Sequence, residues 1–92
     1  MPYHVIISPN ITRAIGALGL ARTALLNLLF RIRLDLEGEA DDHRRHRDSL
    51  DPSFFWYQII VIDQDRERLL RFAVDDSRAP GYRFLEAVQE AD

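Results

Sequence analysis

The chain has 92 residues, 47% of them hydrophobic and 29% charged, with a formal net charge of −3 at pH 7. This size and composition are typical of one globular domain over residues 1–92, and the negative charge argues against a broadly basic protein that binds DNA directly. The absence of cysteine excludes disulfides and thiolate metal sites. No signal peptide is visible, and no apolar run reaches the ~20 residues that cross a bilayer, so we expect a cytoplasmic protein without a membrane partner.

The first segment predicts a short strand that leads directly into a helix. Residues 3–8, YHVIIS, are mostly apolar on both faces of an extended chain. Ser8 can accept hydrogen bonds from the free N–H groups of a first helical turn, and Pro9 suits the first helical position. Apolar residues then recur at helical spacing as far as Gly19, which favours the left-handed conformation that ends many helices.

A longer helix is expected over residues 20–37, before Gly38. It carries one apolar stripe for the core and a second one, Leu26, Phe30 and Leu34, at intervals of four. Two explanations of the second stripe are open. The first helix can fold back as an αα-hairpin and cover it, or it can form an interface with a partner or a second copy of the chain.

Residues 39–53, EADDHRRHRDSLDPS, predict a polar loop. Either the loop is simply solvated, or its basic edge binds a phosphate or a partner through Arg44, Arg45 and Arg47. His43 and His46 are three residues apart, which suits a shared metal ion on a helix, but no third ligand is near them in the sequence. We therefore expect no metal and no cofactor.

The stretch FFWYQIIVI, residues 54–62, is the most apolar strand pattern in the chain. Because both of its faces read as apolar, we expect it at the centre of a sheet with other elements packed on each face. The same reading predicts that Trp56 is largely buried. A polar turn then leads to residues 68–75, RLLRFAVD, which predict an antiparallel neighbour. Arg71 lies inside that strand and has to reach water or an acid.

The last segment, residues 82–91, places Phe84, Ala87, Val88 and Ala91 at the spacing of one helical face. We therefore predict a C-terminal helix. Together these elements predict an α+β fold with an N-terminal strand, an αα-hairpin, a mostly antiparallel sheet of three or four strands, and a C-terminal helix.

Two stretches carry a resemblance to a known family. The opening MPYHVIISPNITRAIGAL and the segment WYQIIVIDQDRERLLRFAVDDSRAPGYRF resemble the RelE/ParE superfamily, the toxins of bacterial type II toxin–antitoxin modules. The resemblance implies a sheet with a concave face. Members that cut mRNA in the ribosome place arginine, lysine, histidine or tyrosine on that face, whereas the ParE branch acts on DNA gyrase by binding.

Carried over to this chain, the resemblance gives an incomplete catalytic set. Gln58 occupies the central-strand position where family members often have arginine, and Asp75 and Asp76 follow where basic residues are common. The family's extra strand before the central one has its only candidate in residues 46–50. The nuclease reading is left with one set of candidate residues: Arg78, Tyr82, Arg71 and His46.

These considerations favour a toxin-like protein that acts through protein–protein contacts, with an antitoxin as its natural partner and DNA gyrase or the ribosome as its target. A metal-independent, ribosome-dependent mRNA endoribonuclease is the alternative from the enzyme class. A non-toxic adaptor, acting as a homodimer on the same fold, is the third possibility.

Overall fold

The computed structural model describes residues 3–38 and 45–91. The described residues form two helices and five strands, with both helices between the first and the second strand, which confirms the α+β class. In chain order they are β1 (His4–Ile7), α1 (Pro9–Gly16), α2 (Arg22–Glu37), β2 (Arg45–Arg47), β3 (Phe54–Asp63), β4 (Arg66–Asp75) and β5 (Tyr82–Ala91).

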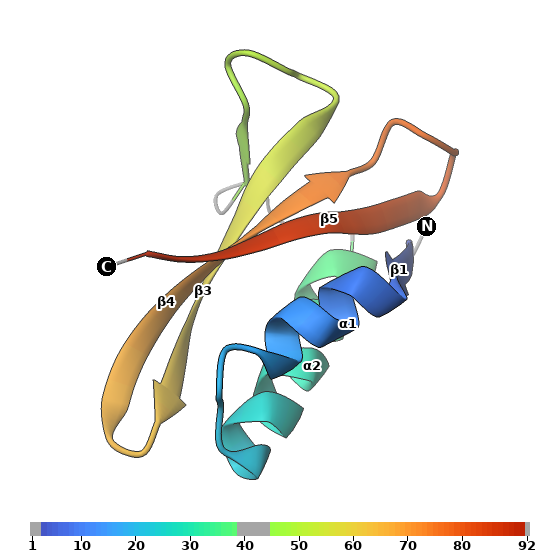
Figure 1. The fold of residues 1–92 in the computed structure, drawn as a ribbon. Coiled ribbons are helices and arrows are strands. Elements are labelled where there is room, and N and C mark those ends of the chain that lie inside the picture. The colour runs from blue at the N-terminus through green and yellow to red at the C-terminus, as the bar shows by residue number, and fades with distance from the viewer. Residues whose placement is uncertain (1–2, 39–44, 92) are drawn as a thin grey trace.

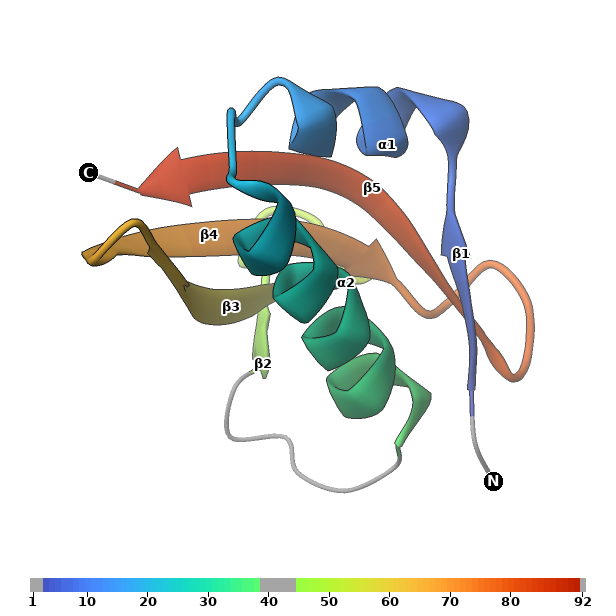
Figure 2. The ribbon, with the colours of Figure 1, turned by 90° about the horizontal axis from the view of Figure 1, so that it is seen from below.

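The five strands form one curled sheet in the order β1-β5-β4-β3-β2 (Figure 1). β1 pairs with β5 in parallel, and every other pair of neighbours is antiparallel. Both helices lie on the same side of this sheet, with α1 along β5 and α2 across β3 and β1 (Figure 2). The sheet therefore has one face covered by helices and one face that no described element covers, which we call the open face.

The start of α1 follows the sequence prediction. Ser8 is the N-cap, and its hydroxyl oxygen accepts a hydrogen bond from the backbone N–H of Ile11 at 3.3 Å. Pro9 occupies the first helical turn, where its missing N–H costs nothing. Gly19 has φ 71°, the left-handed conformation that glycine adopts easily. A strand and a helix are thus joined with a single capping residue between them.

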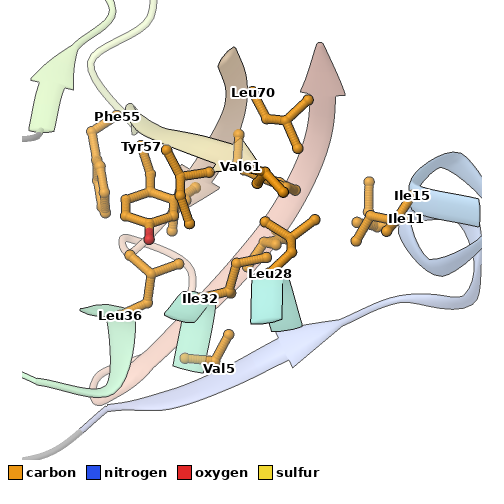
Figure 3. Close-up of a cluster of buried hydrophobic side chains, with 14 of the residues drawn as sticks. Val5, Ile11, Ile15, Leu28, Ile32, Leu36, Phe55, Tyr57, Val61 and Leu70 are labelled. Atoms are coloured by element: carbon orange, nitrogen blue, oxygen red, sulfur yellow. The ribbon is translucent and has the colours of Figure 1, made fainter. Parts of the chain in front are cut away.

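The core lies between the helices and the covered face of the sheet (Figure 3). α2 contributes one buried stripe at helical spacing, Ala24, Leu28, Ile32 and Leu36. β3 contributes every second residue, Phe55, Tyr57, Ile59 and Val61. Side chains of α1, β1, β4 and β5 complete the cluster. One helix stripe packed on alternating strand residues is the ordinary geometry of a two-layer α+β domain.

The central-strand prediction was wrong, because only one face of β3 is buried. The alternate residues of β3 lie on the other face, where Trp56 is half-buried, Ile60 is 48% exposed and Ile62 is 59% exposed. The strand is also not central in the sheet, since its outer neighbour β2 has three residues and pairs only with residues 55–57. The candidate for an extra strand, residues 46–50, is a strand only at residues 46–47, because β2 begins at Arg45 and ends at Arg47.

The predicted C-terminal helix was also wrong, because residues 82–91 form β5. This strand lies between β1 and β4 and pairs with both of them. The register against β4 shifts between Ala73 and Val74, so that Glu86 is the extra residue of a β-bulge. The sheet consequently has five strands instead of three or four.

Arg68 of β4 fixes the hairpin end of the sheet to the connection between the helices. Its guanidinium donates to both carboxylate oxygens of Glu90, at 2.7 and 2.6 Å, and to Asp63 at 3.2 Å. It also donates to the carbonyl oxygen of Leu18 at 2.7 Å. The hydrogen bonds from Arg68 hold the pKa of Glu90 below its usual value.

Candidate functional site

The second stripe of α2 is exposed. Leu26, Phe30 and Leu34 have 55%, 64% and 64% of their surface accessible, so α1 does not cover them. α1 packs against β5 instead of folding back over this stripe. The αα-hairpin explanation is therefore wrong, and the partner or self-association explanation stays a proposal.

A hollow of about 460 Å³ lies between α1, α2 and the end of β1. It is lined mainly by apolar side chains, Ile7, Thr12, Ile15, Gly16, Leu25, Leu29 and Arg33. A second hollow lies beside it, lined by Phe30, Arg33, Leu34 and Glu37. Because Arg33 lines both hollows, they adjoin on the surface of the helix layer. We call the two hollows together with the exposed stripe the helix groove.

The open face of the sheet collects most of the residues that the nuclease reading singled out. Arg71 is opposite Gln58 on β3 and Gln89 on β5. Its guanidinium lies over the indole ring of Trp56, 4.5 Å from the ring centroid. Directly opposed residues of neighbouring strands share a face, so Arg71, the two glutamines and Trp56 form one cluster, which we call the Arg71 cluster.

Arg78 and Tyr82 lie at another part of the open face, around Phe84 of β5. The guanidinium of Arg78 is 4.3 Å from the centroid of the Phe84 ring, and it forms an ion pair with Glu86 at 2.9 Å. The Tyr82 ring is stacked with Phe84 at a centroid distance of 6.2 Å. Arg78 is thus exposed and forms a surface ion pair with an acid.

His4 joins this group although sequence reasoning did not select it. Its ring lies 5.2 Å from the Tyr82 ring, because β1 and β5 are parallel and place residues 4 and 82 opposite each other. The parallel pairing is invisible when residues 82–91 are read as a helix. If residues 82–91 are predicted as a strand, parallel pairing with β1 places His4 beside Tyr82.

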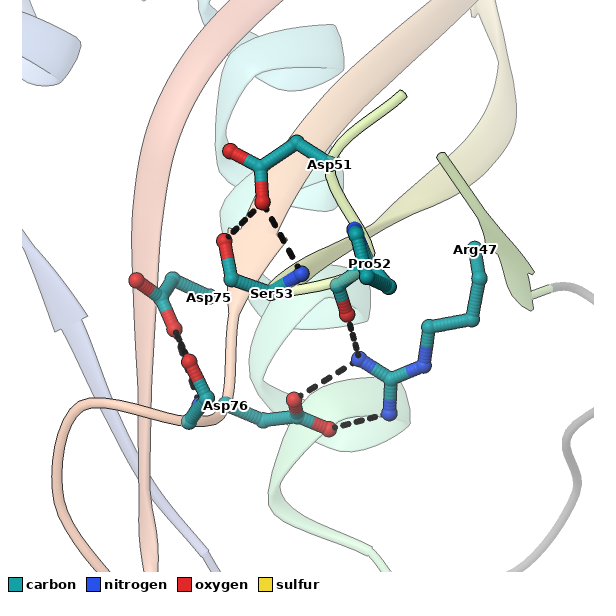
Figure 4. Close-up of polar contacts among 7 residues, drawn as sticks. Arg47, Asp51, Pro52, Ser53, Asp75 and Asp76 are labelled. Carbon is teal, nitrogen blue, oxygen red and sulfur yellow. Dashed lines mark hydrogen bonds and ion pairs between the residues drawn. The ribbon is translucent and has the colours of Figure 1, made fainter. Parts of the chain in front are cut away.

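The basic loop residues divide among several places. In the register of β2, His46 is opposite Trp56 and Arg45 is opposite Tyr57. Arg44 and His43 lie outside the described residues. Arg47 reaches the loop after β4, where its two Nη groups donate to the carboxylate oxygens of Asp76 at 2.9 and 3.0 Å (Figure 4).

This pairing affects what Arg47 and Asp76 can do. Burial works to raise the pKa of Asp76, but the hydrogen bonds and charge of Arg47, with the charge of Arg83, hold it below its usual value. Asp76 is therefore ionised at neutral pH and offsets the charge of Arg47. Asp75 is engaged next to it, accepting from the backbone N–H and the hydroxyl of Ser77, both at 2.8 Å.

The open face can therefore stack planar groups on its aromatic rings and bind an anion at Arg71. Neither described helix has the length and hydrophobicity that a membrane crossing needs. No family model matches the chain, and comparison with curated proteins and with solved structures gives no significant match.

Proposed function

We propose that this protein is a toxin-like member of the RelE/ParE superfamily that acts through protein–protein contacts and is held by an antitoxin on the helix groove. The observation that carries the proposal is the exposed stripe of α2, where Leu26, Phe30 and Leu34 are each more than half accessible. The element order of a strand, two helices, a charged segment and a hairpin agrees with the resemblance in the sequence.

The chemistry of the groove suits a helical segment of a partner. Large apolar side chains in one row gain about 25 cal/mol for each Å² that a partner removes from water. An amphipathic helix recognises such a row through residues at intervals of three and four. Arg33, at the junction of the two hollows, and Glu37, in the second hollow, place one charge of each sign in the groove, which favours a partner segment with an acidic residue opposite Arg33 and a basic residue opposite Glu37.

Co-purification with the product of a small adjacent gene tests this proposal. Phe30→Asp should leave the protein folded, because the side chain is 64% exposed, and should abolish capture of the partner. Ile62→Asp is the matched control, since it places the same charge at a 59% exposed apolar residue on the other side of the sheet. Partner capture that survives Phe30→Asp as well as Ile62→Asp would contradict the helix-groove site.

A second candidate function, mRNA cleavage on the ribosome, is favoured by one observation. Arg71, Arg78 and Tyr82 come from β4, the following loop and β5 onto a single open face, as the enzyme reading requires. Against it, Arg78 is paired with Glu86, and Asp75 and Asp76 lie at the exit of β4 where a phosphate would need positive charge.

Expression of the isolated gene in a bacterial host separates the two functions. With the protein-contact function, growth inhibition should persist in Arg78→Ala and Tyr82→Phe, and mRNA should remain intact. Cuts in mRNA at fixed codon positions that disappear in those two variants would favour the nuclease. Removal of one electrostatic group from such a site typically lowers the rate by about 10²–10³-fold, which primer extension would detect.

A further inference from the structure

Arg71 lies in the interior of β4, and its guanidinium is on the open face over Trp56. Among the described residues, none forms an ion pair or a hydrogen bond with its guanidinium, which contacts the face of Trp56 at 4.5 Å. By contrast, Arg68 is paired with Glu90 and Asp63, and Arg78 with Glu86. An interior-strand charge has to reach water, an acid or a ligand, and Arg71 has no acid among the described residues.

The accessibility of the Arg71 nitrogen atoms shows from where a ligand would approach. Nε is buried and has no hydrogen-bond partner, whereas the two Nη groups, which also have no partner, are not buried. The Nη groups therefore contact solvent while the inner side of the guanidinium is covered. Two N–H groups that point outward in one plane match the two oxygens of a carboxylate or a phosphate.

The neighbours of Arg71 add further donors and an apolar rim. Gln58 and Gln89 are directly opposite Arg71 on the two adjacent strands, so two amide side chains share its row of the open face. One row further along the strands lie Leu69 and the exposed Ile60, opposite each other. Trp56, which belongs to the cluster, lies on the opposite side of Arg71 from that row. The site thus combines one cation, two neutral amides and apolar groups at strand spacing.

We propose that the Arg71 cluster binds the side-chain carboxylate of an acidic residue in a protein segment that has apolar neighbours. The guanidinium receives the two oxygens through its Nη groups, Gln58 and Gln89 donate from their amides, and the apolar neighbours of the acid pack on Leu69 and Trp56. This surface lies on the opposite side of the sheet from the helix groove, so it is independent of the partner proposed there.

Charge favours a single carboxylate over a nucleic-acid strand. Glu67 and Asp75 are four residues from Arg71 in each direction along β4, about 13 Å away, and both are at open-face register positions. A single carboxylate bound at Arg71 therefore occupies a different row of the sheet from either acid. A strand of phosphodiesters, with one negative charge per nucleotide, would meet both of them, and the chain itself carries a net charge of −3.

Titration of the ¹⁵N-labelled protein followed by NMR tests the proposal. The probes are the blocked peptide acetyl-Leu-Glu-Leu-amide, its glutamine counterpart acetyl-Leu-Gln-Leu-amide, and the single-stranded RNA hexauridylate. The glutamate peptide should give saturable shifts at the side-chain amides of Gln58 and Gln89. Arg71→Gln should weaken its binding about 10-fold or more, because a charge-assisted bidentate contact is lost.

Two further variants keep the result interpretable. Arg71→Lys retains the charge but loses the planar fork, so it should bind with intermediate affinity, while Arg66→Gln, at the exposed hairpin turn, should bind as the wild type does. Equal binding of the glutamine peptide would overturn the proposal, as would the absence of saturable shifts up to about 10 mM glutamate peptide. Tighter, Arg71-dependent binding of hexauridylate would also overturn it and assign the cluster to nucleic acid.

Discussion

The guanidinium of Arg83 donates a hydrogen bond from Nη1 to the carbonyl oxygen of Leu36, over 2.7 Å, and another to that of Gly38, over 3.2 Å. Arg83 belongs to β5 and is only 1% exposed, with its charge 3.6 Å from the centroid of the Tyr3 ring. The last turn of a helix leaves carbonyl groups unpaired and carries partial negative charge, which a buried arginine satisfies. The last strand of the chain thus completes the C-terminal end of α2.

Replacement of Arg83 by leucine should therefore lower the free energy of unfolding by about 2–4 kcal/mol, since it leaves buried carbonyl groups without donors. For a domain of this size, 1 kcal/mol corresponds to a shift of about 4–8 °C in the unfolding midpoint. Arg78→Leu is the control, because it removes an exposed ion pair and an exposed contact with the Phe84 ring, and should change stability by no more than about 1 kcal/mol. Equal midpoints for Arg83→Leu and the wild type would show that this contact does not stabilise the fold.

Local signals predicted several elements of the fold well. Three features depend on residues that are close in the sequence, and the structure contains each of them. They are the cap at Ser8, the spacing of the buried residues of α2 and the antiparallel pairing of β3 with β4. Residues 82–91 are different, because LEAVQEA favours a helix locally while pairing with β1 and β4 on both edges makes it a strand. The pairing with β1 joins residues about 80 positions apart, which local spacing cannot reveal.

The candidate site was predictable in its residue types and not in its layout. Arg71, Arg78 and Tyr82 were selected from the sequence, but their division into two groups on the open face follows from the register of β5. His4 could not be found without that register. The reading of Phe54–Ile62 as apolar on both sides also hid the open face, because half-exposed aromatic and branched residues look the same as buried ones in a sequence.

The turn of the β3–β4 hairpin contains two residues in the left-handed conformation, Gln64 with φ 51° and Asp65 with φ 63°. Two-residue turns of this kind favour Asn-Gly, because glycine adopts a positive φ without steric cost. The double substitution Gln64→Asn and Asp65→Gly should stabilise the protein by about 1 kcal/mol in chemical denaturation. Glu67→Gly, inside β4 with ordinary strand geometry, should instead destabilise it, and stabilisation by both changes would contradict the turn argument.

The ion pair between Arg47 and Asp76 predicts a dependence of stability on pH. Its hydrogen bonds and charge hold the pKa of Asp76 in the folded protein below the value of about 3.9 in an unfolded chain, against the opposing effect of burial. A depressed carboxylate pKa contributes stability that is fully present above the unfolded pKa and is lost as the pH falls through the folded pKa. The contribution of Asp76 should therefore be lost as the pH falls below about 4.

Thermal unfolding measured between pH 7 and pH 2.5 tests this loss of the Asp76 contribution. Asp76→Asn and Arg47→Gln should both make the decline below about pH 4 shallower than in the wild type, because each removes the difference between the folded and unfolded pKa. If Arg47→Gln leaves the acid slope unchanged while Asp76→Asn flattens it, a group other than Arg47 lowers the pKa of Asp76.

The last prediction concerns the edge of β3 that faces away from β4. The turn at residues 64–65 makes Asp63 and Arg66 a hydrogen-bonded pair, so alternation along the hairpin points the N–H and C=O of Ile60 away from β4. Within the described chain, β2 pairs with β3 only as far as Tyr57, and Nη1 of Arg31 donates to the outward carbonyl oxygen of Ile60 at 2.8 Å. A side chain that occupies an open strand edge blocks pairing with another chain.

Arg31→Ala should therefore promote self-association that increases with concentration, since it frees the edge beside two exposed isoleucines, Ile60 and Ile62. Light scattering and sedimentation at increasing concentration measure this directly. A second substitution, Ile60→Lys, should restore the behaviour of the wild type by placing a charge on the edge. Arg22→Ala, at an exposed position of the same helix, should have no effect. If Arg31→Ala remains as monodisperse as Arg22→Ala at every concentration, Arg31 does not protect this edge.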